Sequence, residues 1–328
     1  MKIGVLGATG AVGRQMIQCL TEQEIPVEEL RLFASARSAG TELPFNGGSV
    51  VVEEVNEARF AGLDVVFGAV SNALAKQYAP AIKAAGALFI DNSSAFRLDP
   101  ENPLVVPEIN GEDAKHNNGI IANPNCSTII AMMAVAPIHR LSPIKRIVAS
   151  TYQAVSGAGN GGIAELAEEI EQIRAGEPVQ PKVFPAQIAY NCIPWIGSEK
   201  ENGYTTEEMK MENEGRKILH DPELKVSCTC VRVPVYRSHS VSVSLECERA
   251  IGLEEAEAAL SSYPGVVYGG KDYPMPLKTS DQDLVYVGRL RRDLVFDGGL
   301  ALWCCGDQIR KGAASNAVGI LKYLLENK

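Results

Sequence analysis

The sequence predicts an α/β protein built from two domains, and three observations support this. The chain has 328 residues, which exceeds one ordinary core and suits two domains. Roughly the first 120 residues alternate short apolar runs with helical stretches, which is typical of a parallel sheet. The middle of the chain carries longer segments in which polar and apolar residues alternate, as expected of strands in a largely antiparallel sheet.

The N-terminal domain is expected to be a parallel sheet with helices on both faces. Apolar runs lie at residues 2–7, 30–35, 64–70, 87–91 and 119–123. Helical stretches such as Arg14 to Glu22 and Ala73 to Ala84 separate them. We assign residues 1–124 to this domain and expect a last helical segment, residues 308–328, to return to it.

The second domain, residues 125–307, is predicted to be α+β. Candidate strands lie at residues 146–155, 225–235 and 239–248. Helical stretches run from Gly162 to Arg174, Thr206 to Leu219 and Leu253 to Ser261. Each strand is expected to pack one face on helices.

Composition narrows the classes of partner. A net charge of −9 spread along the chain argues against a nucleic-acid ligand. No apolar run approaches the ~20 residues of a membrane span, and no signal peptide is evident, so we expect a cytoplasmic protein. The eight cysteines contain no CxxC pair and the four histidines no HExxH motif, so no metal site is predicted. Small molecules are the expected partners, and most cysteines should be reduced and buried.

A glycine-rich turn follows the first predicted strand, with the sequence GATGAVG at residues 7–13. Small residues let the backbone approach a pyrophosphate, and the following helix offers free amides and a partial positive charge. The spacing is GxxGxxG rather than GxGxxG, and an ordinary strand-to-helix turn is the alternative. We predict a Rossmann-like dinucleotide-binding domain, with cofactor contacts from Gly7, Thr9, Gly10, Ala11 and Val12.

The end of the second strand indicates which dinucleotide binds. An NAD enzyme usually has an acidic residue there, whereas this chain has Ser35, Arg37 and Ser38. A guanidinium and two hydroxyls suit a 2′-phosphate, so NADP(H) is the predicted cofactor. The alternative is that Arg37 is a solvated loop residue.

Cys126 is the candidate nucleophile. Asn125 is a good N-cap before the apolar run 129–136, which puts Cys126 in the first turn of a helix, where free amides and the dipole stabilise a thiolate. The cysteines at 19, 192, 228, 230 and 247 fit structural roles in or near strands and the first helix.

A thiol beside NADP(H) indicates aldehyde chemistry through a thioester. The thiolate adds to an aldehyde, hydride leaves to the nicotinamide, and phosphate or another acceptor cleaves the thioester. His239 is the candidate acid–base group, because a near-neutral pKa would let it exchange the hemithioacetal proton. A hydrogen-bonded strand histidine is the alternative.

Seven motifs together resemble the aspartate-semialdehyde dehydrogenase family along the whole chain. They are GATGAVG, SARS, NSSAFR, NPNCST, YQAVSGAG, RVPVYRSH and GDQIRKGAASNA. The resemblance implies reversible, NADPH-dependent reductive dephosphorylation of L-aspartyl 4-phosphate to L-aspartate 4-semialdehyde and phosphate. It also implies a place in lysine, diaminopimelate, threonine and methionine biosynthesis, and a homodimer formed through the second domain, with a tetramer still possible.

The resemblance also implies roles for individual residues. Cys126 is the nucleophile and His239 the acid–base catalyst. Gln153 orients the substrate, Arg232 clamps its α-carboxylate, and Glu207 meets its amine. Further substrate or phosphate contacts are expected from Arg97, Asn125 and Lys210, and further cofactor contacts from Ser156, Gly157 and either Gln308 or Asn316. Glu207 and Lys210 could instead be an ordinary solvated pair on one helix face.

Three other functions are kept open. A reductase of N-acetylglutamyl phosphate would not need Glu207 to pair with a free ammonium, and its nucleophile motif typically resembles NPGC rather than NPNC. A relative such as malonyl-CoA reductase would accept a coenzyme A thioester and would not depend on phosphate. A non-catalytic NADP-binding sensor would not need Cys126.

Overall fold

A computed structural model describes residues 1–327 of the chain, which divides into two compact units. The first contains residues 1–125 and 313–327, and the second runs from Cys126 to Gly312. The boundaries expected from the sequence were 124/125 and 307/308, whereas residues 308–312 belong to the second unit.

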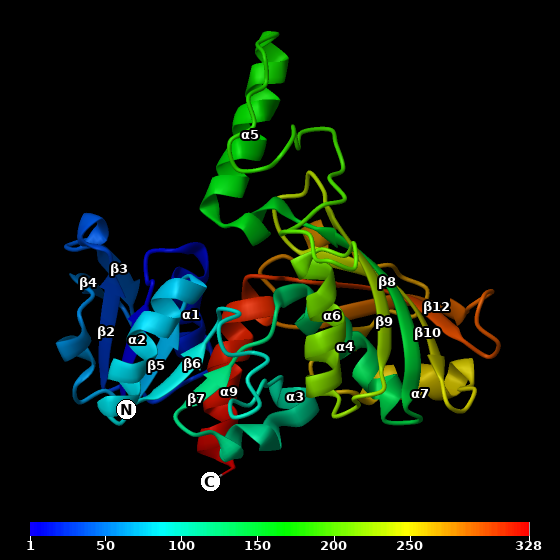
Figure 1. Ribbon diagram of the computed structural model, residues 1–328, viewed down its shortest axis with the longest axis horizontal. Coiled ribbons are helices and arrows are strands. Elements are labelled where there is room, and N and C mark those ends of the chain that lie inside the picture. Colours follow the sequence, from blue (N-terminus) through cyan, green and yellow to red (C-terminus); the bar gives the residue numbers. More distant parts are fainter. Residues whose placement is uncertain (328) are drawn as a thin grey trace. The chain divides into compact units, whose positions relative to one another are not determined.

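The first unit is built on a seven-stranded sheet with the order β3-β4-β2-β1-β5-β6-β7 (Figure 1). Neighbouring strands are parallel, apart from the antiparallel β3–β4 pair at one edge. The strands are β1 (Lys2–Leu6), β2 (Glu29–Ala34), β3 (Glu42–Phe45), β4 (Gly48–Glu54), β5 (Val65–Gly68), β6 (Leu88–Asp91) and β7 (Ile120–Ala122). The fold class is the one expected, but the β3–β4 hairpin was not predicted.

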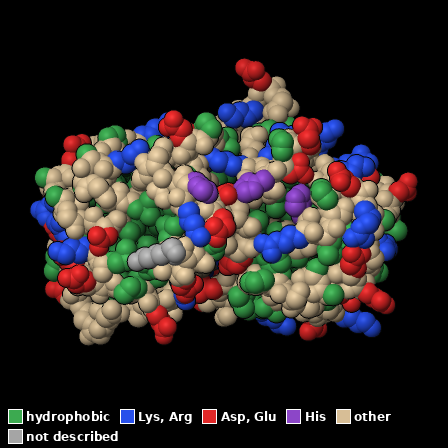
Figure 2. Space-filling model, turned by 90° about the horizontal axis from the view of Figure 1, so that it is seen from below, with side chains coloured by type: hydrophobic (Ala, Val, Ile, Leu, Met, Phe, Trp, Pro, Cys, Tyr) green, Lys and Arg blue, Asp and Glu red, His purple; other side chains and the backbone are tan. Residues whose placement is uncertain are grey.

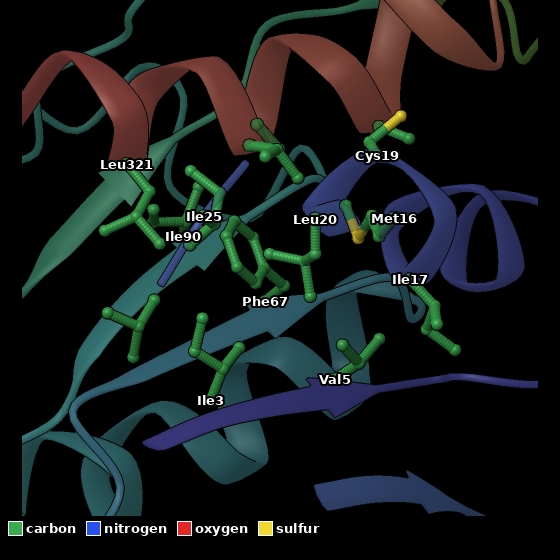
Figure 3. Packing of buried hydrophobic residues seen from close by; sticks show 14 of the residues in the cluster. Ile3, Val5, Met16, Ile17, Cys19, Leu20, Ile25, Phe67, Ile90 and Leu321 are labelled. Atoms are coloured by element: carbon green, nitrogen blue, oxygen red, sulfur yellow. The ribbon is translucent and has the colours of Figure 1, made fainter. Parts of the chain in front are cut away.

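Helices cover both faces of this sheet. On one face, α1 (Ala11–Glu22) and α9 (Ser315–Glu326) pack against each other and on the strands, and Figure 3 shows Leu20, Leu321 and Phe67 in this cluster. On the other face, α2 (Asn72–Ala84) packs over a second cluster that contains Phe89. The short helix α3 (Pro107–Asn110) contacts α9, so the C-terminal helix does return to the first unit.

The second unit is built on a six-stranded sheet with the order β11-β12-β13-β10-β8-β9. The inner pairs are antiparallel, whereas the outer pairs β8–β9 and β11–β12 are parallel. The strands are β8 (Ile144–Gln153), β9 (Lys225–Arg232), β10 (His239–Cys247), β11 (Val266–Tyr268), β12 (Val285–Arg292) and β13 (Leu300–Gly306). The last three were not predicted from the sequence.

One face of the second sheet is covered by α4 (Cys126–His139), α6 (Thr206–Ile218) and α7 (Leu253–Ser262). Helix α4 is apolar on every side and almost entirely buried, as expected of a central helix. Strand β8 shows the alternation: Ala149 and Thr151 are buried, while Val148 and Tyr152 on the opposite face are exposed. Helix α5 (Asn160–Ala175) packs on the 3-10 turn Val155–Ala158, and α8 (Pro276–Thr279) contacts β13.

Among residues 1–327, no helix is long and apolar enough to cross a membrane. On the face that Figure 2 shows, acidic and basic side chains are intermixed rather than gathered by sign.

Replacing Leu321 tests the packing of α9 in the first unit. Leu321 is 2% exposed within the cluster of Figure 3. Leu321→Ala should lower the free energy of unfolding by about 2–5 kcal/mol, because it removes buried methyl groups and leaves a cavity. Urea denaturation measures this loss. Lys322→Ala, on the same helix but half-exposed, is the control and should change it by less than about 0.5 kcal/mol.

Candidate active site

The topology of the second sheet gathers three polar side chains at one edge. Gln153 ends β8 and Arg232 ends β9, and the two residues are paired in the parallel register. Strand β10 runs antiparallel to β8 and begins at His239, so its first residue lies at the same edge. Helix α4 begins at Cys126, whose sulfur lies against His239. Four predicted site residues therefore meet within one unit.

Cys126 is the first residue of α4, as the sequence predicted. Amides in the first turn of a helix lack partners within the helix and favour a negative charge. Gly312 lies against this helix start, and a Cβ at position 312 would come 2.8 Å from the Cβ of Cys126. Glycine is therefore required for this approach. Gly312 was not predicted as a site residue, although it lies in the motif GDQIRKGAASNA.

His239 faces the sulfur of Cys126. Its Nε2 lies 3.4 Å from Sγ, and its Nδ1 accepts a hydrogen bond of 3.0 Å from the Ala154 amide. Because Nδ1 is an acceptor, the neutral ring carries its hydrogen on Nε2. The preceding residue, Ser238, has a φ of 71°, a left-handed conformation that turns the chain into β10.

Burial, together with the positive charge of Arg232, lowers the pKa of His239 to about 3, although the negative charge of Glu207 opposes this shift. The expectation of a near-neutral pKa is therefore wrong for the free protein. His239 is neutral at physiological pH and presents an Nε2–H group to the site.

Gln153 is held by its neighbours in a single orientation. Its Nε2 donates to Glu207 at 3.2 Å and lies 3.4 Å from the Nε2 of His239. Its Oε1 accepts from the Thr151 hydroxyl at 3.0 Å. Thr151, which the sequence analysis missed, lies two residues earlier on the same face of β8.

Arg232 is a buried guanidinium with fixed surroundings. Its Nη1 donates to the Ala154 carbonyl at 2.7 Å, and its Cζ lies 5.8 Å from the centre of the Phe184 ring. Burial lowers the pKa of Arg232, while the Cys126 and Glu207 charges raise it. A Cβ at Gly157 would come 2.6 Å from Nη1, so Gly157 leaves the space that Arg232 occupies.

Glu207 and Lys210 form an ion pair of 2.7 Å on α6. A capping box between Thr205 and Glu208 starts this helix. Glu207 is only 8% exposed and also bonds to Gln153, so an ordinary solvated pair does not describe it. The structure brings this carboxylate into the cluster with Arg232 and His239.

The glycine turn of the first unit is closely packed against the protein backbone. Gly7 has a φ of 85°, and a Cβ there would lie 2.3 Å from the Ala69 carbonyl oxygen. A Cβ at Gly13 would lie 2.2 Å from the Gly7 oxygen. Helix α1 follows Gly10, which has no side chain to cap the first amides of the helix. Thr9, Ala11 and Val12 line the same turn.

The segment after β2 carries the residues predicted to select NADP(H). Arg37 lies in the 3-10 turn Ala36–Ser38, with Ser35 immediately before it. Arg37 and Ser35 are exposed, and Ser38 is half-buried. No carboxylate occurs between Ser35 and Ser38.

Gln308 and Asn316, the two C-terminal cofactor candidates, lie in different units. The amide nitrogen of Gln308 donates to the Ser156 hydroxyl, and its oxygen accepts from the Ser238 amide at 2.8 Å. Asn316 instead donates to the Val105 carbonyl at 3.0 Å and to the Asn123 side chain at 2.8 Å within the first unit.

Arg97 and Asn125 also belong to the first unit. Arg97 is buried and donates to the Asn92 carbonyl at 2.8 Å. Asn125 is buried directly before α4.

The other cysteines have different surroundings. Five of them, at positions 19, 228, 230, 304 and 305, are buried, and all eight cysteines, which lie within the described residues 1–327, are free thiols. Burial raises the pKa of Cys247 to about 11, so its thiol stays protonated. Cys192 departs from the expectation because it is exposed.

The fold and the thiol site define a dehydrogenase of the semialdehyde class, and the family comparisons agree. The NAD binding domain of semialdehyde dehydrogenase matches residues 2–117, and the dimerisation domain of the same enzymes matches residues 135–311.

The chain belongs to the aspartate-semialdehyde dehydrogenase family. It is 47% identical to the Aquifex aeolicus aspartate-semialdehyde dehydrogenase, over 99% of this chain and 98% of the relative. The structure of aspartate semialdehyde dehydrogenase II from Vibrio cholerae complexed with ASA matches with a TM-score of 0.98 and 42% identity, over 99% and 98% of the two chains. The structure of the Candida albicans aspartate semialdehyde dehydrogenase with NADP matches with a TM-score of 0.75 and 25% identity, and the match covers 99% of this chain and 98% of that one.

The buried neutral state of His239 predicts a specific sensitivity to acid. The unfolded chain binds a proton near pH 6.5, whereas folded His239 does so only near pH 3, so stability falls as the pH drops through this range. Between pH 7.5 and 5.5, the wild type should lose about 1 kcal/mol more unfolding free energy than His239→Asn does.

Urea denaturation of both proteins at the two pH values measures this difference. Asn is chosen because its side-chain oxygen can replace Nδ1 as the acceptor for the Ala154 amide. Equal losses in the two proteins would contradict a depressed pKa for His239.

Proposed function

We propose that the protein catalyses the reversible, NADPH-dependent conversion of L-aspartyl 4-phosphate to L-aspartate 4-semialdehyde and phosphate. The observation that carries this proposal is the 3.4 Å approach of Cys126 Sγ to the Nε2 of His239, in a cluster that also holds Arg232 and Glu207. Family membership and the relative complexed with ASA support the choice of substrate.

The charges of the site suit an amino acid that keeps both of its main-chain groups. Arg232 offers a guanidinium to the α-carboxylate, and Glu207 offers a carboxylate to the ammonium group. The amide of Gln153 joins Glu207 to the edge of the sheet. We assign Lys210, Arg97 and Asn125 to the phosphate or the substrate, as the sequence suggested.

In the biosynthetic direction, the Cys126 thiolate attacks the acyl carbon of aspartyl phosphate, the C–O bond to phosphate breaks, and a thioester remains. A nicotinamide cofactor, held by the glycine turn at residues 7–13, would supply the hydride for reduction of this thioester. Hydride addition makes the acyl carbon tetrahedral, and its negatively charged oxygen accepts a hydrogen bond from the neutral Nε2–H of His239. Breaking the C–S bond then releases the aldehyde and regenerates the thiolate. His239 thus acts by presenting this hydrogen, a narrower role than the proton exchange expected from the sequence.

We assign NADP(H) as the cofactor. Gly7 and Gly13 allow the tight strand-to-helix turn that suits a pyrophosphate, and Arg37 with Ser35 and Ser38 offers donors to a 2′-phosphate. The NADP complex of the Candida albicans relative supports this choice. Ser156 and Gly157 are assigned to the nicotinamide end. Gln308, which bonds to Ser156, is favoured over Asn316, whose amide bonds within the first unit.

Buried Glu207 favours the aspartyl substrate over an N-acetylated one. An acylated nitrogen carries no charge, so it would offer Glu207 no ionic contact beyond the one with Lys210. A coenzyme A thioester as substrate would remove the dependence on phosphate, and a non-catalytic sensor would not depend on Cys126. One assay distinguishes the proposed function from these three alternatives.

The assay follows NADPH absorbance while the protein oxidises aspartate semialdehyde, with and without phosphate. Wild type should form NADPH only with phosphate, and Cys126→Ser should lose at least about 10³-fold in kcat, because a hydroxyl is a far weaker nucleophile than a thiolate. NAD in place of NADP should react more slowly.

Cys192→Ser is the matched control, because this exposed cysteine lies outside the cluster and its replacement should leave the rate unchanged. Turnover by Cys126→Ser at the wild-type rate would overturn the proposal. Activity with N-acetylglutamate semialdehyde alone would favour the rival substrate.

We also propose that the uncovered face of the second sheet forms a homodimer interface. The Tyr152 and Trp303 rings lie 5.3 Å apart, and Val148 on the same face is 48% exposed. This face lies opposite the helices, within the region that matches a dimerisation domain. A two-fold axis would pair it with its own copy.

Val148→Asp should weaken this dimer at least tenfold in Kd, because a charge would be buried opposite apolar side chains. Sedimentation velocity over a range of protein concentrations measures the change. Val51→Asp, an equally exposed valine of β4 in the first unit, should leave the dimer unchanged. Identical sedimentation of both variants would contradict this interface.

A further inference from the structure

The segment 182–193 lies beside Arg232 and forms no strand of the second sheet. It is nevertheless fixed to helix α5 and to β9, and it brings one aromatic ring over the guanidinium. We propose that Glu165 of α5 is a positioning residue that holds Phe184 against Arg232, and that Phe184 thereby strengthens the binding of the substrate carboxylate. This inference rests on the role proposed above for Arg232.

Glu165 is a buried carboxylate, 4% exposed, that binds consecutive backbone amides. Its Oε1 accepts from the Phe184 amide at 3.0 Å, and its Oε2 accepts from the Lys182 amide at 2.9 Å and from the Val183 amide. The Phe184 amide is buried and belongs to no strand, so it would lack a hydrogen-bond acceptor without the carboxylate. Bonds from N–H to an ionised acceptor are the stronger kind.

Two further attachments fix the rest of the segment. One turn further along α5, Glu169 accepts from the Ile188 amide at 2.9 Å and from the Ala189 amide at 2.7 Å. Ile193 and Arg232 then exchange two backbone hydrogen bonds of 2.9 Å each. The segment is thus held at its start, middle and end, and its end is held by the backbone of Arg232 itself.

Phe184 links this scaffold to the site. Its buried ring lies with its centre 5.8 Å from the Arg232 Cζ and lines a pocket with Arg232, Ile193 and Trp195. The ring keeps water from this side of the guanidinium and attracts its charge. A carboxylate that binds Arg232 then does so in a less polar medium, where charge–charge attraction is stronger.

Glutamate cannot be replaced by its isosteric amide without a penalty. Both oxygens of Glu165 accept backbone hydrogens, so Gln would turn an NH₂ group toward at least one N–H donor. Phe184 would then lose its fixed place over Arg232, although no group that touches the substrate would have changed.

The test is steady-state kinetics of the full-length protein. Glu165→Gln and Phe184→Leu should each raise the KM for aspartate semialdehyde about fivefold, with kcat within about twofold of wild type and the KM values for NADP and phosphate unchanged. Glu171→Gln, an exposed glutamate of α5, is the control and should match wild type. Should Glu165→Gln fail to fold, Phe184→Leu still carries the test.

A double variant separates a positioning role from a general loss of structure. Arg232→Lys alone should raise the KM for the semialdehyde, and adding Phe184→Leu to it should raise that KM no further. If the two substitutions raised the KM for the semialdehyde additively, the positioning role of Glu165 and Phe184 would be overturned, while the role of Arg232 would stand. Lower kcat together with changes in every KM would overturn the positioning role in the same way. An unchanged KM in Arg232→Lys would overturn the proposed role of Arg232 and this inference with it.

Discussion

The burial of the Arg232 guanidinium is the constraint on which the site depends. A positive charge removed from water must be compensated, and here the Ala154 carbonyl, the Phe184 ring and the nearby Glu207 charge surround it. The same charge helps to keep His239 neutral. Gly157 is needed because any side chain there would fill the place of the guanidinium. Several features of the site therefore follow from one arginine.

Ala154 connects these features through its backbone alone. Its carbonyl accepts from Arg232 and its amide donates to His239, so one peptide segment after β8 sets both the guanidinium and the imidazole tautomer. The side chain of residue 154 contributes only its methyl group. This backbone role cannot be recognised from the residue type, since every residue other than proline has the same amide and carbonyl.

Much of the fold and of the site could be predicted from the sequence, because the signals were local. Alternating apolar runs predicted the parallel strands of the first unit, and an N-cap followed by an apolar run put Cys126 at the start of α4. The depressed pKa of His239 could not be predicted, because it arises mainly from complete burial, which depends on tertiary packing, and also from the positive charge of Arg232. Likewise, Gly312 reaches Cys126 only through tertiary packing. The β3–β4 hairpin and strands β11 to β13 were missed because no strong alternation was recognised there.

The two faces of strand β8 are assigned different functions. Thr151 and Gln153 point toward the catalytic cluster, whereas Val148 and Tyr152 point toward the face assigned to a second subunit. A shift of one residue along this strand would exchange the two sets. Insertions and deletions in β8 should therefore be excluded by selection even where single substitutions are tolerated. The proposed subunit interface and the proposed site therefore constrain the same ten residues of β8.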